Sequence, residues 1–158
     1  MFEGFRREDK APVPQLAIPV AVPEQMGMIG LSADATPKEQ AVGDLSLIAF
    51  YYLLRVGEYT QKKKRPSTRT VQFRMKDIAF KRGNVILPHD SPIEELMTAT
   101  AATLRLSNQK NGIRGSMIHR SAMEGPYCPV KAILRWFTHL RNNKAPRETI
   151  ISILHSCL

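Results

Sequence analysis

The chain has 158 residues, and 23 lysines and arginines against 14 acidic residues give it a net charge of +9. This length suits one domain of ordinary size and nearly excludes a two-domain enzyme. The positive charge favours a polyanionic partner, either nucleic acid or an acidic membrane surface. Two cysteines are too few for a disulfide framework or a structural zinc site, so no metal is expected.

The amino-terminal residues and the longest apolar run indicate where the protein is located. The first ten residues carry six charges and no apolar core, which is unlike a secretory signal peptide, and we expect an intracellular protein. The longest mostly apolar run, residues 45–54, is shorter than the roughly 20 residues that span a bilayer. No transmembrane helix is therefore expected. The lack of a long amphipathic helix with a lysine-rich face argues against a membrane surface as the partner, so no membrane partner is expected.

Residues 1–35 are expected to form an extended, proline-rich lead-in. Helical and strand periodicity are both weak there, and the segment contains four spaced prolines, Pro12, Pro14, Pro19 and Pro23. This spacing favours polyproline-like geometry, and a disordered tail explains it equally well. The domain itself is then expected in residues 36–158.

A long helix is expected to begin at Thr36. Thr36 can cap the helix, Pro37 suits its first position, and Glu39 is placed to complete a capping box. Apolar residues then recur at steps of three and four, at Ala41, Leu45, Ile48 and Tyr52. Gly57 is the expected stop.

Short strands are expected after this helix. Residues 70–75 alternate as a half-buried strand does, and residues 78–80 and 85–87 flank a turn, which predicts a hairpin. Residues 93–100 can open as a helical turn after two prolines.

A second hairpin is expected around the dipeptide Asn111-Gly112, which favours a two-residue turn. Residues 103–107 alternate before it, and residues 117–118 supply a return strand. Lys110 would then lie beside the tip of the hairpin.

A second clear helix is expected to begin at Pro129. Its apolar residues share one face: Val130, Ile133, Leu134, Phe137 and Leu140. The order of helix, several short strands and helix predicts an α+β fold of mixed helices with a small antiparallel sheet.

Residues 54–60 place Arg55 at the end of the first helix, with Glu58 three residues later. A guanidinium in that position can present its planar fork to a phosphate while the acid fixes its orientation. An ordinary helix-terminal arginine that interacts with the helix dipole explains the same residues, and spacing alone favours that simpler interpretation.

Residues 109–115 offer Lys110 on a hairpin tip, from which an ammonium group can reach a groove or donate a proton. A solvated turn lysine is the commoner case. The presence of both features in one small basic chain shifts the balance toward a phosphate site.

Taken together, these residues resemble the tyrosine recombinases, also called phage integrases, and especially their eukaryotic retroelement-like branch. Residues 54–60 are similar to the family's first box, in which an arginine and a nearby acid end a helix. Residues 109–115 are similar to the hairpin that carries the active-site lysine, and residues 128–130 to the segment after it. The likeness covers roughly residues 10–142.

The resemblance implies metal-free and cofactor-free DNA strand exchange, as in DNA recombination and integration, through a 3′-phosphotyrosyl link. It implies that Arg55 stabilises charge on the non-bridging phosphate oxygens and that Lys110 protonates the departing 5′ oxygen. Glu58 would hold the arginine in a supporting role. DNA is the implied partner, with a possible oligomer assembled on it and a nuclear location if the source is eukaryotic.

The family's His-x-x-Arg box and its nucleophilic tyrosine have no match in this sequence. The four tyrosines, Tyr51, Tyr52, Tyr59 and Tyr127, all come too early. We therefore expect the amino-terminal half of a recombinase catalytic domain, truncated, able to bind DNA and inactive alone. The alternative is a non-catalytic DNA-binding or interaction module derived from the same scaffold.

Truncation has an expected structural cost. The second helix would lose partners contributed by the missing half, and an apolar patch would be left exposed. Its expected members are Ile133, Phe137, Leu140, Ile150, Ile151, Ile153 and Leu154.

A dense basic run follows the first box. Its side chains could contact the DNA backbone, act as a nuclear localisation signal, or be a solvated loop. The residues expected to contact DNA are Lys62, Lys63, Lys64, Arg65 and Arg69, together with Arg114 beyond the second hairpin.

Overall fold

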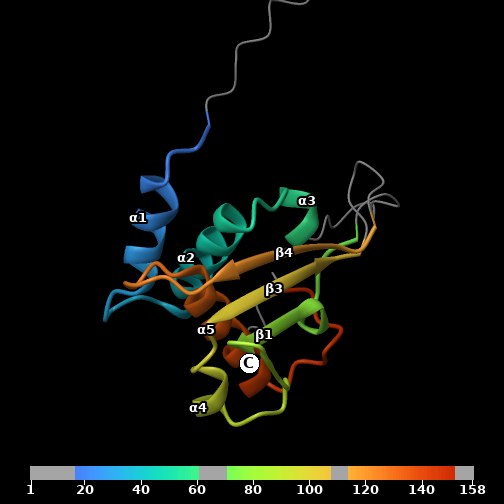
Figure 1. Cartoon of the computed structure of the whole chain (residues 1–158). Coiled ribbons are helices and arrows are strands. Elements are labelled where there is room, and N and C mark those ends of the chain that lie inside the picture. Colours follow the sequence, from blue (N-terminus) through green and yellow to red (C-terminus); the bar gives the residue numbers. More distant parts are fainter. Residues whose placement is uncertain (1–16, 61–70, 108–113, 152–158) are drawn as a thin grey trace, which may run out of the picture.

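A computed structural model of the chain describes residues 17–60, 71–107 and 114–151. Within these residues the fold is mixed α+β, as expected, with one four-stranded antiparallel sheet in the order β2-β1-β3-β4. Helices α2 and α5 pack against each other and cover one face of the sheet (Figure 1).

Helix α1 spans Ala21–Gly30, so the extended geometry expected for residues 1–35 is wrong over these ten residues. Pro23 lies in the first turn of the helix. The backbone N–H groups of a first turn have no partner inside the helix, so a proline there removes no hydrogen bond. Prolines near residue 20 therefore mark a helix start.

Glycines allow α1 to lie directly against α2. A Cβ atom on Gly43 would sit 2.7 Å from the carbonyl oxygen of Met26, and one on Gly30 would sit 2.8 Å from the carbonyl oxygen of Glu39. Both distances are too short for a side chain. The two helices thus meet backbone to backbone.

Helix α2 spans Pro37–Tyr51 and begins as expected. Thr36 Oγ1 accepts a hydrogen bond from the backbone N–H of Glu39 at 3.3 Å, and Glu39 Oε2 accepts one from the N–H of Thr36 at 2.8 Å. The expected stop at Gly57 is wrong, because the helix ends six residues earlier. Leu53 then adopts a left-handed backbone, with φ of 53°, and the short helix α3 follows at Val56–Tyr59.

The first expected hairpin is confirmed. Strands β1, Ile78–Arg82, and β2, Val85–Leu87, pair with Arg82 opposite Val85. The expected helical turn is α4, Ile93–Leu96.

Strand β3 spans Ala101–Leu106 and β4 spans Ser116–Ser121. They pair antiparallel from Ala101 opposite Ser121 to Leu106 opposite Ser116. The strands expected on either side of the second hairpin are therefore present. The tip expected at Asn111-Gly112 lies outside the described residues.

The strand expected at residues 70–75 is not formed by the part that the structure describes. Only an isolated antiparallel bridge joins Arg74 to Ile150, and a 3-10 turn, η1, follows at Met75–Asp77. Phe73 and Met75 are buried, which explains the alternating pattern. Their backbone N–H groups donate to the carbonyl oxygens of Glu58 and Thr149, which are not part of a strand.

Helix α5 spans Pro129–Asn142, and the expected apolar face is buried. The ring of Phe137 meets that of Phe80 from β1 edge-on, with centroids 5.2 Å apart. Ile133, Phe137, Leu140 and Ile151 are each 1% exposed or less, so the exposed patch expected there is wrong for these four residues. Ile150 is half-buried, and Ile153 and Leu154 lie outside the described residues. The sheet, α2 and Ile151 close over the apolar face of α5.

Candidate nucleic-acid interface

The turn that carries Arg55 is anchored to the β3–β4 hairpin. The buried hydroxyl of Tyr52 donates to the carbonyl oxygen of Ala102 at 3.1 Å. Arg120 Nε donates to the carbonyl oxygen of Tyr51 at 2.6 Å, and the Arg120 guanidinium carbon lies 6.0 Å from the centre of the Tyr52 ring. Side chains from both partners therefore fix where α2 ends.

Glu58 holds the backbone of the same turn. It is 3% exposed, and its Oε2 accepts a hydrogen bond from the backbone N–H of Arg55 at 2.8 Å. Its carbonyl oxygen accepts from the N–H of Phe73 at 2.9 Å. Glu58 and Arg55, which were expected to interact, are thus bonded through the backbone N–H of Arg55. The role of Glu58 in holding the guanidinium stays a prediction.

Arg55 itself is exposed, at the start of α3. A polar group fixes the backbone on either side of it, while its own side chain faces solvent. The backbone of Arg55 is thus held in place, and its charge is not used in the fold.

The other expected site residues are only partly placed. Arg114 is exposed and lies two residues before β4. The remaining ones, Lys110, Lys62, Lys63, Lys64, Arg65 and Arg69, lie outside the described residues. The convergence of Arg55 and Lys110 on one face therefore stays a prediction.

Arg120 is a site residue that sequence reasoning missed. It lies on β4, one residue after the exposed His119, and its half-buried side chain bonds to the end of α2. The alternation of β4 gives the signal that could have found it, because Arg120 shares the inward face with Ile118. A cation on an inward face needs a buried acceptor, and the last carbonyls of a helix supply one.

The uncovered face of the sheet is also basic. Arg105 and Met117 lie opposite each other in the register and are exposed. They line a shallow depression of about 360 Å³ together with Lys76, Asp77, Ile78, Ala79 and Thr103. Next to it, Thr103 Oγ1 and His119 Nδ1 are 3.0 Å apart, within hydrogen-bonding distance.

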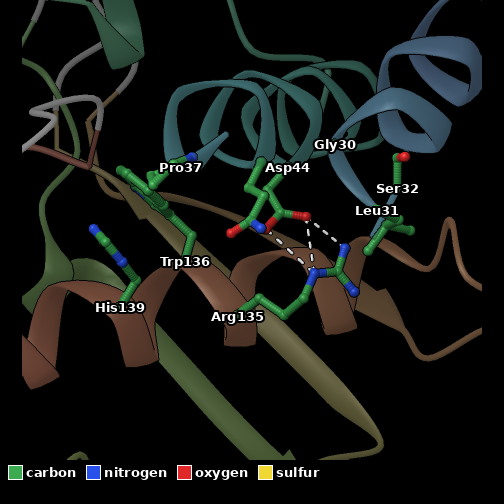
Figure 2. A pocket seen from close by; sticks show the side chains of 9 residues that line it. Gly30, Leu31, Ser32, Pro37, Asp44, Arg135, Trp136 and His139 are labelled. Carbon is green, nitrogen blue, oxygen red and sulfur yellow. Dashed lines mark hydrogen bonds and ion pairs between the residues drawn. The ribbon is translucent and has the colours of Figure 1, made fainter. Parts of the chain in front are cut away.

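A second concavity lies between the α1–α2 connection, α2 and α5 (Figure 2). Its volume is about 240 Å³. Asp44 from α2 and Arg135 from α5 point toward each other across it, with Arg135 Nε 3.0 and 3.2 Å from the two carboxylate oxygens. Burial raises the pKa of the Asp44 carboxyl, more than the hydrogen bonds and charge of Arg135 lower it.

The same concavity holds an aromatic stack. The rings of Trp136 and His139 lie 4.9 Å apart and within 9° of parallel. The indole N–H donates to the carbonyl oxygen of Ile151. The polar groups here pair with one another, so we interpret the concavity as a structural joint between α2 and α5. Sequence reasoning missed this pair, whose members are 91 residues apart.

Compared with protein-family models, with curated proteins and with solved structures, the chain has no match in any of the three. None of the helices in residues 17–60, 71–107 and 114–151 is long and apolar enough to cross a membrane. The same residues contain no group of three or more His, Cys, Asp or Glu side chains that could hold a metal ion.

Proposed function

We propose that the chain binds duplex DNA through the Arg55 end of α2, as the amino-terminal part of a tyrosine recombinase catalytic domain. The observation that carries this proposal is the exposed Arg55 on a turn held by Tyr52, Glu58 and Arg120. That turn is bonded to the hairpin whose connection contains Lys110. Because the backbone of Arg55 is held, its guanidinium reaches toward a phosphate from a defined position on the turn.

No ion pair in the described part of the chain neutralises the two cations of the proposed site that it contains, a property that they share with other surface cations such as Lys81 and Arg105. Among the residues that the structure describes, acidic side chains engage Arg74, Lys76, Arg82 and Arg135. Arg55 and Arg114 belong to none of these pairs. Their charge is therefore available to a phosphate backbone.

The proposed chemistry is binding without cleavage. Arg55 contacts the non-bridging oxygens of one phosphate through its planar fork, and Lys110 lies near the leaving oxygen. No tyrosine of this sequence matches the family's nucleophile, so a polypeptide of these 158 residues forms no phosphotyrosyl link.

A second candidate is a non-catalytic DNA-binding module built on the same scaffold. One observation favours it: the apolar face of α5 is already covered by other described residues, including Ile151. A closed core of this kind needs no further catalytic half in order to fold.

Fluorescence anisotropy with a duplex of about 30 base pairs tests DNA binding. Between about 50 and 200 mM salt, we expect the affinity to fall at least about tenfold, because each phosphate contact releases counterions. Arg55→Ala should weaken binding to all sequences alike and flatten the salt dependence by about one contact. An affinity that stays constant across this salt range contradicts the proposal.

The matched control removes one cation elsewhere. Lys144 is exposed at the end of α5 with φ of 56°, a conformation that asparagine tolerates. Lys144→Asn should leave the salt dependence unchanged. Equal losses from Arg55→Ala and Lys144→Asn would mean that net charge alone, and not the Arg55 turn, determines binding.

A nicked suicide substrate tests the absence of cleavage. After incubation and a denaturing gel, we expect no covalent protein–DNA adduct from this chain. A tyrosine-linked adduct would show that one of Tyr51, Tyr52, Tyr59 and Tyr127 is the nucleophile, and the expectation that this chain lacks the nucleophile would be wrong.

A further inference from the structure

Helix α1 presents a row of apolar side chains to solvent. Pro23, Gly27 and Gly30 face α2, whereas Val22, Met26 and Ile29 lie one residue round the helix and are 42, 36 and 53% exposed. Their spacing of four and three residues places them along one stripe.

This stripe borders a groove between the two helices. The groove has a volume of about 280 Å³, and its apolar walls are Met26, Ile29 and Val42 of α2. Thr36, Lys38 and Glu39 line its other side. We call Val22, Met26, Ile29 and Val42 the α1 stripe.

The charge of the chain indicates what can cover the α1 stripe. Glu24 is the only charged residue between positions 11 and 33, in a chain with a net charge of +9. None of the four residues of the α1 stripe is a cation, so the stripe offers nothing to the phosphates of nucleic acid. Two copies of the chain repel each other over most of their surface, and the α1 stripe is a face on which they can meet without juxtaposed cations.

The edge of the groove is complementary to itself. It carries one charge of each sign on neighbouring residues, Lys38 and Glu39. A two-fold axis brings the same patch of both copies together, so each lysine can lie opposite a glutamate. A partner that carries charges of one sign only can pair with Lys38 or with Glu39, but not with both.

We propose that the α1 stripe is the docking surface for a second copy of this chain, with α1 against α1 across a two-fold axis. Ile29 of each copy enters the groove of the other. A ten-residue helix buries less than the roughly 800 Å² per partner of a standard interface, so the dimer is weak and depends on concentration.

The dimer leaves the proposed DNA-binding end accessible. Helix α1 contacts the first half of α2, through Gly43, and Arg55 follows the other end of that 15-residue helix. Figure 1 shows α1 and α3 on opposite sides of α2. Dimer formation through the α1 stripe therefore does not depend on DNA binding.

Sedimentation equilibrium of the full chain without DNA tests the inference. From about 1 to 200 μM protein, we expect the mean mass to rise from 17.8 kDa toward twice that value. Ile29→Asp should raise the dissociation constant of the dimer at least about tenfold, because it places a carboxylate in the groove of the partner copy. Val22→Asp, on the stripe but outside the groove, should raise it in the same direction and decides the matter if Ile29→Asp fails to fold.

The matched control is Met117→Asp. Met117 is 71% exposed on the uncovered face of the sheet, away from α1, and its replacement should leave the dissociation constant unchanged. A chain that remains monomeric over the whole range overturns the inference. So does an equal loss from Met117→Asp, or a monomer that floats with neutral phosphatidylcholine vesicles through the α1 stripe.

Discussion

The two ends of α2 are held in the fold by different means. At its first half, glycines bring the backbone of α1 into contact, and the buried Asp44 pairs with Arg135 of α5. After its last turn, polar side chains reach main-chain groups instead: the buried Tyr52 and the half-buried Arg120 bond to carbonyl oxygens, and the buried Glu58 of α3 bonds to an N–H.

The difference determines what each end offers to a partner. Along the first half of α2, the charge of Arg135 is neutralised by Asp44, and the exposed groove beside α1 has apolar walls that include Val42. Where the turn is held through main-chain groups, Arg55 keeps its charge and its exposure. The first half of α2 is therefore expected to govern stability and self-association, and the last turn to govern binding to an anion.

Removing the charge of Arg135 should have the largest effect on stability. Arg135→Met leaves Asp44 nearly buried without its partner, and we expect the free energy of unfolding to fall by about 3 kcal/mol. Urea denaturation measures it. The double variant Asp44→Leu with Arg135→Met should recover most of the loss, and a single-variant loss below about 1 kcal/mol would show that the pair is not a joint of the fold.

Gly43→Ala tests the contact between α1 and α2. In an uncrowded helix this change stabilises by about 1 kcal/mol, but here the new methyl group meets the Met26 carbonyl oxygen. We expect a loss of about 2 kcal/mol in the free energy of unfolding, measured with urea. Lys38→Ala, at an exposed residue of the same helix, is the control and should change stability by less than about 0.5 kcal/mol. A stabilising Gly43→Ala would mean that the helices do not meet backbone to backbone.

Tyr52→Phe tests the other end of α2. Loss of its hydroxyl should cost about 1 kcal/mol, through the bond to Ala102. Burial also raises the pKa of the Tyr52 hydroxyl, more than the charge of Arg120 lowers it. An unfolded tyrosine ionises near pH 10, so the wild-type chain should lose stability as the pH rises above about 10, and the variant should lose less. Identical pH profiles from urea titrations at pH 8 and about 10.5 would contradict this environment for Tyr52.

Arg55→Ala should have the smallest effect on stability. Its side chain is exposed and its backbone bond to Glu58 is kept, so we expect the free energy of unfolding to change by less than about 0.5 kcal/mol. Thermal unfolding followed by circular dichroism measures it. A larger loss would mean that the guanidinium supports the fold, and the contrast between the two ends of α2 would disappear.

Elements specified by neighbouring residues could be predicted from the sequence. The capping box of Thr36 and Glu39 and the apolar face of α5 each need only a few turns of chain. Helix α1 was missed because four prolines were interpreted alike, although Pro23 occupies a first turn, where it costs nothing. The end of α2 was missed because Tyr52 is fixed by Ala102, which is 50 residues away.

In the candidate site too, some residues could be predicted from the sequence and others could not. Exposed cations next to a helix end, such as Arg55, are visible in the sequence. The residues that position it are not, since Arg120 lies 69 residues from the Tyr51 carbonyl that it binds. The partner of Asp44 was hidden for the same reason. Contacts between distant residues leave no periodic signal in the chain.

The distance in sequence between α2 and α5 has a consequence for synthesis on the ribosome. Arg135 is made 91 residues after Asp44, which at about 5 to 20 residues per second is a delay of roughly 5 to 20 s. Helix α1 is made just before α2, so their glycine contact can form at once. The side of α2 that packs against α5 must wait for that helix and is exposed to chaperones and to other nascent chains in the interval. Slower synthesis lengthens that exposure, and lower temperature weakens the apolar attraction that makes it harmful.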